Sequence, residues 1–334
     1  MNMRYVAPLV ALVIAVAVGV YTLRPSPGEF AGATMGTTWS VRVSGGADSG
    51  LRDAIQARLD KLDAEMSTWR ADSAISRFND SRSGEWFSVS PDFAAVVAEA
   101  QRVAAVSGGA FDITVLPLIE LWAPGKKAEP TQAEIDTTLR HVGYRKLDVR
   151  ANPPGLRKLD PEVRIDLSAL GSGYAAGKIA ELLEAAGVHD YLVNVGGTLC
   201  AAGHGDLGRG WHVGVEAPLP GVRLVQRRVV LESGGLSTSG DYRQIVERGG
   251  RRHSHFIDPM TGRPVDGPLA SVTVVDRSPI TADAMDTALM VMGLDRGLAV
   301  ARALNVPAMF IVRHGEGLEE RMTGGFEKLL IKPE

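Results

Sequence analysis

Three oxygen-bearing side chains near the C-terminal end of the sequence have the spacing of a metal site. Asp283, Asp286 and Thr287 stand at positions i, i+3 and i+4, so on a helix their oxygens share one face and lean toward its N-terminus. Magnesium prefers oxygen ligands and often completes its shell with water and substrate phosphate. This set therefore suits a metal-bound phosphate ester. Acidic residues near a helix start also cap it and offset its dipole, and spacing alone leaves both interpretations open.

Two glycine-containing segments have the composition of ligand-binding turns. A predicted strand over 163–167 contains Asp166 and leads into a Gly-rich turn at 171–173, which precedes a predicted helix over 174–186. Glycine lets the backbone approach a ligand, and a helix N-terminus favours phosphate. A second predicted strand ends in Gly196-Gly197. Neither segment is a Rossmann fingerprint or a P-loop, and each alone also fits an ordinary loop.

A hydroxyl-rich turn is predicted at 237–242, and a histidine stands shortly before a tight turn farther along the chain. His255 precedes Asp258-Pro259 and Gly262. A lone histidine in this setting is more often structural than catalytic. It is nevertheless the best candidate for a general base in the sequence.

Helices and short strands must position these residues. Capping, spacing and stop signals predict helices over about 49–68, from Ser90-Pro91 to Gly108-Gly109, from 131, from Thr281 to 292, and over 295–304. Residues 111–115 look extended. Runs rich in β-branched or aromatic residues predict strands at 191–195, 211–216, 224–232, 242–246, 255–257, 271–275 and 308–312. The predicted class is α+β, with antiparallel or mixed sheets and packed helices.

Composition is that of an ordinary globular protein. Of the 334 residues, 45% are hydrophobic and 22% are charged. A net charge of −3 gives no global electrostatic reason to bind nucleic acid, so an anionic substrate must be held by local groups. The single cysteine, Cys200, lies in an apolar setting that predicts a small buried side chain rather than a reactive thiol.

The N-terminus carries an apolar run of 18 residues, Val6 to Leu23, between Arg4 and Arg24. This length is just enough to span a bilayer as a helix. A cleavable signal peptide is the alternative, because Ala15-Val16-Ala17 offers a cleavage site. We favour an uncleaved anchor since the apolar run continues past that site. The predicted organisation is an anchor or signal peptide over 1–24, a linker over 25–29 and a catalytic domain over 30–334, exported in either case.

Taken in order, these segments resemble the ApbE family of FAD:protein FMN transferases over nearly all of residues 33–330. The match includes Thr34-Met35-Gly36-Thr37 near the start and Ala282-Asp283-Ala284-Met285-Asp286-Thr287 near the end. Further segments that carry the resemblance are 66–69, 76–79, 109–115, 121–122, 166–175, 194–197, 237–242 and 254–262.

The resemblance implies two sets of site residues. It implies an FAD site lined by Met35, Trp69, Ala110, Phe111, Asp112, Asp166, Ser172 and Ile257. It also implies Mg²⁺ bound by Asp283, Asp286, Thr287 and the backbone carbonyl of Ala169. The implied reaction transfers FMN from FAD to a Thr or Ser hydroxyl of an acceptor flavoprotein, forms a phosphoester and releases AMP. Asp283 and His255 would be its catalytic residues, with His255 as the base that takes the hydroxyl proton.

Two positions depart from the family pattern and keep alternatives open. Many relatives carry lysine where this chain has Ser172 and an acid where it has Thr198. The alternatives are an FAD pyrophosphatase that releases free FMN and AMP, and a non-catalytic FAD-binding or delivery protein. The N-terminal apolar run and its flanking arginines predict a catalytic domain in the periplasm, held at the inner membrane by the N-terminal helix. The expected acceptor is a membrane redox subunit or another extracytoplasmic protein.

Overall fold

A computed structural model describes residues 28–45, 48, 50–123, 128–205, 207–242, 245–248, 251–315 and 317–332. The predicted anchor or signal peptide over 1–24 lies outside the described residues. In the part of the chain that is described, none of the helices combines the length and hydropathy needed to cross a bilayer.

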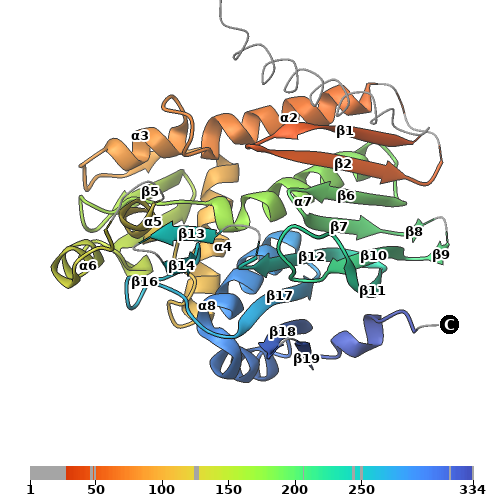
Figure 1. Cartoon of the computed structure of the whole chain (residues 1–334). Helices are drawn as coiled ribbons and strands as arrows, with labels where there is room; N and C mark the ends of the chain where they lie inside the picture. Colours follow the sequence, from red (N-terminus) through yellow and green to blue (C-terminus); the bar gives the residue numbers. More distant parts are fainter. Residues whose placement is uncertain are drawn as a thin grey trace, which may run out of the picture.

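An eight-stranded sheet is the frame of the described chain (Figure 1). Every neighbouring pair of its strands is antiparallel. In spatial order the strands are β1 (Glu29–Thr34), β2 (Thr37–Val43), β6 (Tyr191–Val195), β7 (Thr198–Ala202), β12 (Ser233–Gly240), β17 (Leu269–Asp276), β18 (Ala308–His314) and β19 (Gly317–Thr323).

The two faces of this sheet are covered differently, because successive side chains point to opposite faces. Cys200 and Phe310 pack against the helical side, which comprises α2 (Leu51–Met66), α7 (Ser168–Ala185) and α8 (Pro279–Ala303). Their neighbours Ala201 and Met309 pack on the other side, against β10 (Trp211–Glu216), β11 (Val225–Leu231) and η3 (Phe326–Leu329). A small hairpin, β8 (His204–Gly205) and β9 (Gly208–Arg209), extends from this layer.

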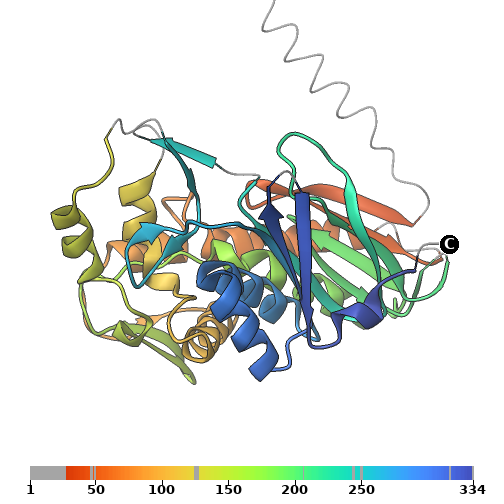
Figure 2. The same ribbon diagram turned by 60° about the horizontal axis from the view of Figure 1, so that its bottom comes forward.

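A smaller, helix-rich region lies beside the sheet (Figure 2). Its helices are α3 (Ala74–Asp80), α4 (Pro91–Val106), η1 (Ile113–Val115), α5 (Leu116–Trp122), α6 (Gln132–Leu139) and η2 (Tyr144–Lys146). Its strands are β3 (Phe87–Ser88), β5 (Pro154–Lys158) and β4 (Leu147–Ala151), with the hairpins β13 (Ile245–Arg248) to β14 (Arg251–Ser254) and β15 (Ile257–Asp258) to β16 (Arg263–Pro264).

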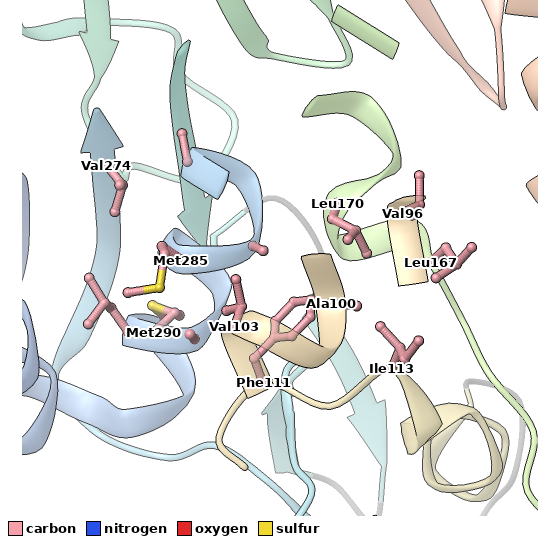
Figure 3. Packing of buried hydrophobic residues seen from close by; sticks show 14 of the residues in the cluster. Val96, Ala100, Val103, Phe111, Ile113, Leu167, Leu170, Val274, Met285 and Met290 are labelled. Atoms are coloured by element: carbon pink, nitrogen blue, oxygen red, sulfur yellow. The ribbon is translucent and has the colours of Figure 1, made fainter. Parts of the chain in front are cut away.

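One continuous hydrophobic core joins this region to the sheet. Val103 of α4, Phe111 and Leu167 belong to the same buried cluster as Met285 of α8 and Val274 of β17 (Figure 3). Each fully buried apolar side chain of this size contributes about 1.5–3 kcal/mol. Helix α8, which carries Asp283 and Asp286, therefore packs against both α4 and the sheet.

Several predicted elements are confirmed where a local signal defines them. Ser90 caps α4 by accepting a hydrogen bond from the N–H of Phe93 at 3.0 Å. Thr131 and Glu134 form the predicted capping box of α6. The strands over 191–195 and 211–216 have the predicted bounds, and Cys200 is buried as expected.

Two predictions around helix starts are wrong. Residues 111–115 are not extended, because the side chain of Asp112 accepts from the N–H of Thr114 and starts the 3₁₀ turn η1. Thr281 does not cap the last long helix, since α8 begins at Pro279 after Ser278. The two helices predicted over 281–292 and 295–304 are the two arms of α8, which meet at Gly293 with φ of 73°.

Four other segments also differ from the prediction. Residues 163–167 form no strand, and the predicted Gly-rich turn at 171–173 is helical, because α7 already begins at Ser168. Residues 237–240 are not a turn but the end of the inner strand β12. Of the strand predicted over 255–257, only Ile257 is in a strand, since β14 ends at Ser254.

Candidate functional site

The predicted acid pair lies deep in the molecule, on the side of α8 that faces the sheet. The exposed fraction of Asp283 is 8% and that of Asp286 is 1%. Because α8 begins at Pro279, both acids lie beyond its first turn, and no side chain caps its N-terminus. The helix-capping interpretation of these two residues is therefore wrong.

Three different elements donate hydrogen bonds to the carboxylate of Asp283. Oδ2 accepts from the Ser172 hydroxyl and from the backbone N–H of Gly173, each at 2.8 Å. Oδ1 accepts from the hydroxyls of Thr198 and Ser237, each at 3.0 Å. Helix α7 and strands β7 and β12 thus hold Asp283 together.

Asp286 is held in a similar way one helical turn farther on. Its Oδ1 accepts from the hydroxyl of Ser239 at 3.0 Å and from that of Thr287 at 3.3 Å. The hydroxyl oxygens of Ser239 and Thr287 lie 3.0 Å apart. Ser239 and Ser237 are two residues apart on β12, so they point to the same face of the sheet. The predicted shared face of Asp283, Asp286 and Thr287 is confirmed.

The electrostatics of this pair call for a cation. Burial raises the pKa of Asp283, and burial together with the nearby charge of Asp283 raises the pKa of Asp286 well above its ordinary value. Among the described residues, no basic side chain forms an ion pair with either acid. Buried charges are normally paired or bound to metal. Two carboxylates and a hydroxyl are hard oxygen donors, and they fit Mg²⁺.

The described side chains do not form a closed cage of metal ligands. Within the described ranges there is no group of three or more His, Cys, Asp or Glu side chains positioned to hold a metal ion. Mg²⁺ usually keeps water and phosphate ligands, so it does not need a complete set of protein ligands. Gly173 N–H, the donor that a regular helix directs at the Ala169 carbonyl, donates to Asp283 Oδ2. The predicted backbone ligand, the carbonyl of Ala169, lies about one turn before this donor in α7, and its role as a ligand stays a prediction.

Two tight hairpin turns lie at the same end of the sheet. Residues 35–36 join β1 to β2, with φ of 46° at Met35 and 71° at Gly36. Residues 196–197 join β6 to β7, with φ of 60° at Gly196 and 105° at Gly197. Positive φ at both central residues is typical of type I′ turns. It is uncommon for a methionine, and backbone strain of this kind concentrates at functional sites.

The β6–β7 turn contacts both the β1–β2 hairpin and α7. Gly196 N–H donates to the carbonyl of Thr38 at 3.0 Å. A Cβ at Gly196 would lie 3.3 Å from Cγ2 of Thr37 and 3.7 Å from Cβ of Ser172. Since Ser172 also donates to Asp283, the predicted site residues Met35 and Ser172 lie in neighbouring segments around the acid pair.

Two further predicted site residues, Asp166 and Trp69, are connected through Thr68. The hydroxyl of Thr68 donates to Asp166 Oδ2 at 3.3 Å, and the N–H of Ser168 donates to Oδ1 at 2.9 Å. Trp69, next to Thr68, is 93% exposed. An exposed indole offers a flat surface on which an aromatic ring can stack, and stacking of FAD on Trp69 stays a prediction.

Four predicted FAD-lining residues have buried side chains: Ala110, Phe111, Asp112 and Ile257. Phe111 packs in the main core. Asp112 accepts from the N–H groups of Thr114 at 2.8 Å and Tyr144 at 2.6 Å, and burial raises its pKa. These side chains support the local fold, and their contact with FAD stays a prediction.

His255 lies in the short segment between β14 and β15. Its ring packs against that of Phe256, with the ring centroids 4.0 Å apart. Phe256 in turn packs against the main core. The segment that carries His255 is thereby anchored, and its role as a base stays a prediction.

The sequence did not identify Ser237 and Ser239 as partners of the acids. A turn was expected there, whereas the strand β12 alternates Ser237, Thr238 and Ser239 between its two faces. The spacing of Ser237 and Ser239 by two residues is the pattern that indicates two hydroxyls on one face of a strand. The glycines and serines around them are also typical of turns, so the sequence favours a turn instead.

Comparisons with known proteins agree with this fold. A family model described as the ApbE family matches residues 35–310. The FAD:protein FMN transferase of Vibrio cholerae serotype O1 is 39% identical over 312 residues, which cover 91% of this chain and 93% of that protein. The FAD:protein FMN transferase of Salmonella typhimurium is 40% identical over 319 residues, covering 93% and 91%.

Two solved structures are similar over most of their length. The flavin transferase ApbE from Vibrio cholerae superposes with a TM-score of 0.82 at 38% identity and covers 90% of this chain and 98% of its own. The apo form of the flavinyl transferase ApbE from Pseudomonas stutzeri gives a TM-score of 0.81 at 38% identity, covering 90% and 96%. The predicted α+β class with a mainly antiparallel sheet is confirmed.

Proposed function

The chain belongs to the ApbE family, and we propose that it transfers FMN from FAD to the hydroxyl of a threonine or serine in an acceptor flavoprotein. The product is a phosphoester, AMP is released, and Mg²⁺ is required. The activity named for the similar proteins supports the transferase class. The observation that carries the metal dependence is the buried pair Asp283 and Asp286, which has no basic partner among the described residues.

The residues proposed to hold the metal are Asp283, Asp286, Thr287 and the carbonyl of Ala169. When bound, Mg²⁺ offsets the negative charge of the FAD pyrophosphate and of the AMP leaving group. The protein's own contribution is geometric. The hydrogen bonds from the Ser172 hydroxyl and the Gly173 N–H of α7 hold one oxygen of the Asp283 carboxylate before any ligand arrives.

The residues proposed to hold FAD lie around the start of α7. Trp69 supplies an exposed ring for stacking on a flat ring of FAD. Asp166, held by Thr68 and Ser168, offers hydrogen-bond acceptors. The turns at 35–36 and 196–197 present backbone where a ligand can approach closely. This arrangement supports binding of an extended dinucleotide across the end of the sheet.

His255 is proposed as the general base. The acceptor hydroxyl attacks the FMN phosphorus and gives its proton to the imidazole. A phosphorus–oxygen bond forms to the acceptor as the bond to AMP breaks, and AMP leaves with the bridging oxygen. The substitution His255→Ala should abolish transfer while FAD binding is retained. Full transfer by this variant would remove His255 from the mechanism.

Product analysis separates this function from its two alternatives. The full chain is incubated with FAD and Mg²⁺, with and without an acceptor flavoprotein, and nucleotides are separated by chromatography. The transferase yields AMP in proportion to modified acceptor. Free FMN and AMP formed equally without acceptor would establish a pyrophosphatase, and bound FAD that stays intact would establish a delivery protein.

The proposed location is the inner membrane, with residues 30–334 in the periplasm and 1–24 as anchor. The support is the apolar run Val6 to Leu23 and its flanking arginines. Protease added to spheroplasts should digest the catalytic domain. Protection of the domain until the cells are lysed would contradict this placement.

A further inference from the structure

A cluster of hydroxyl groups lies between the sheet and the acid pair, and the proposed chemistry does not use it. Thr198 on β7 and Ser237 on β12 are each only 3% exposed. Their hydroxyl oxygens lie 3.1 Å apart, and both reach Asp283 Oδ1 at 3.0 Å. Two buried hydroxyls from neighbouring strands thus converge on one carboxylate oxygen.

The number of protons restricts the arrangement of these hydrogen bonds. The Thr198 oxygen has three oxygen neighbours within 3.1 Å, those of Ser172, Ser237 and Asp283, but each hydroxyl has one proton to donate. An ionised carboxylate only accepts. With Asp283 ionised, Thr198 and Ser237 are therefore both free to donate to Oδ1, while Ser172 donates to Oδ2. The cluster is best satisfied when Asp283 carries its charge.

The scaffold of this cluster is the main sheet. Strand β12 pairs with β7 over residues 233–236 and with β17 over residues 235–240, and it carries Ser237 toward Asp283 and Ser239 toward Asp286. Pairing with β17 therefore sets the backbone positions of Ser237 and Ser239 relative to the acids.

We propose that Thr198 and Ser237 are positioning residues that hold Asp283 in the orientation in which it and Asp286 bind a divalent cation. The proposal rests on the proposed metal site. It adds two residues that are not among the proposed Mg²⁺ ligands. Hydrogen-bond partners of metal ligands typically change metal affinity by about 10–100-fold when they are removed.

The chain supplies matched variants for a test. Thr198→Val and Ser237→Ala remove one hydroxyl each, and Thr198→Ser keeps the hydroxyl of Thr198. Thr238→Val removes the hydroxyl of the residue next to Ser237. The side chain of Thr238 points away from the acids, and its hydroxyl lies 2.9 Å from that of Thr273. Isothermal titration of each full-length protein with MgCl₂ alone gives Kd for Mg²⁺. Melting temperature without Mg²⁺ and binding of FAD without Mg²⁺ report whether the variant is folded.

The expected result is a Kd for Mg²⁺ raised about 10–100-fold in Thr198→Val and Ser237→Ala, with FAD binding retained. Thr198→Ser and Thr238→Val should stay within about threefold of the wild type. Unchanged Mg²⁺ affinity in both hydroxyl-deletion variants overturns the proposal, as does an equal loss in Thr238→Val. A wild-type protein that binds Mg²⁺ but transfers no FMN refutes the proposed function alone, whereas one that binds no Mg²⁺ refutes both.

Discussion

The backbone N–H of Gly173 donates a hydrogen bond to Asp283 Oδ2 at 2.8 Å, and this bond joins α7 to the helix that carries both acids. The contact depends on the absence of a side chain at position 173. A Cβ there would lie 2.4 Å from the carbonyl oxygen of Pro279 and 2.7 Å from Cα of Ile280. Both neighbours are backbone atoms, so neither can move away without displacing the first turn of α8.

Gly173→Ala should therefore separate α7 from α8 and weaken the site. Overpacking of this kind typically costs about 1–3 kcal/mol, and the loss of the Gly173 hydrogen bond should lower Mg²⁺ affinity as well. Chemical denaturation gives the free energy of unfolding, and titration calorimetry gives the Mg²⁺ affinity.

Gly171→Ala is the matched control in the same helix. A Cβ at Gly171 would have no neighbour within 4 Å, and alanine is favoured over glycine inside a helix by up to about 1 kcal/mol. This variant should be as stable as the wild type or more stable. If both alanine variants behave alike, close helix packing at Gly173 is not what holds Asp283.

Lys158 should give the protein a measurable pH dependence of stability. Its side chain is 2% exposed and donates to the carbonyls of Ser81 at 2.7 Å and Asn79 at 3.2 Å, at the end of α3. Burial, followed by the nearby charges of Arg82 and Arg164, lowers the pKa of Lys158 to about 8. Between this value and the ordinary pKa, the unfolded chain holds a proton that the folded chain has released. Stability contributed by this group therefore rises with pH over that window.

Lys158→Met removes this titration. The free energy of unfolding of the wild type, minus that of the variant, should increase by about 1–3 kcal/mol from pH 7.5 to 10, since one pKa unit corresponds to about 1.4 kcal/mol. Urea denaturation at several pH values measures it. A difference that is constant over this range would show that the Lys158 ammonium has an ordinary pKa in the folded protein.

Truncation of two aromatic residues expected at the FAD site should affect different properties, stability for Phe111 and FAD binding for Trp69. Phe111 is 3% exposed in the main core, whereas Trp69 is 93% exposed. Phe111→Ala should destabilise the protein by about 3–5 kcal/mol. Trp69→Ala should change stability by no more than about 0.5 kcal/mol but weaken FAD binding. Thermal denaturation and FAD titration separate the two effects, and unchanged FAD affinity in Trp69→Ala would remove the stacking role.

Much of the fold was predictable because its signals are local. Ser90-Pro91 and the Thr131 to Glu134 box define helix starts by hydrogen bonds within a single turn. The strand over 191–195 alternates buried and half-buried residues as a one-sided strand should. The i, i+3, i+4 spacing of the acids also placed them correctly on one face of α8.

Several wrong predictions concern residues whose conformation is decided by distant neighbours. The sequence predicts a turn at Gly173. In the structure this position requires glycine because the first turn of α8 lies against the α7 backbone there, and no local pattern indicates that contact. The segment around Ser237 and Ser239 has the composition of a loop, and it forms a strand because it pairs with β17, which lies far along the chain. The hydroxyl cluster around Asp283 therefore became visible only when elements far apart in sequence were brought together.

The central claim is that this chain attaches FMN to another protein at a magnesium site built on Asp283 and Asp286. The most direct test is the intact mass of an acceptor flavoprotein after incubation with the full chain and FAD, with Mg²⁺ or with EDTA, and in parallel with the folded variant Asp286→Asn. We predict that the acceptor gains one FMN, less one water, only with the wild type and Mg²⁺. An acceptor modified equally in EDTA or by Asp286→Asn, or an acceptor whose mass never changes while FAD is bound, would contradict the account.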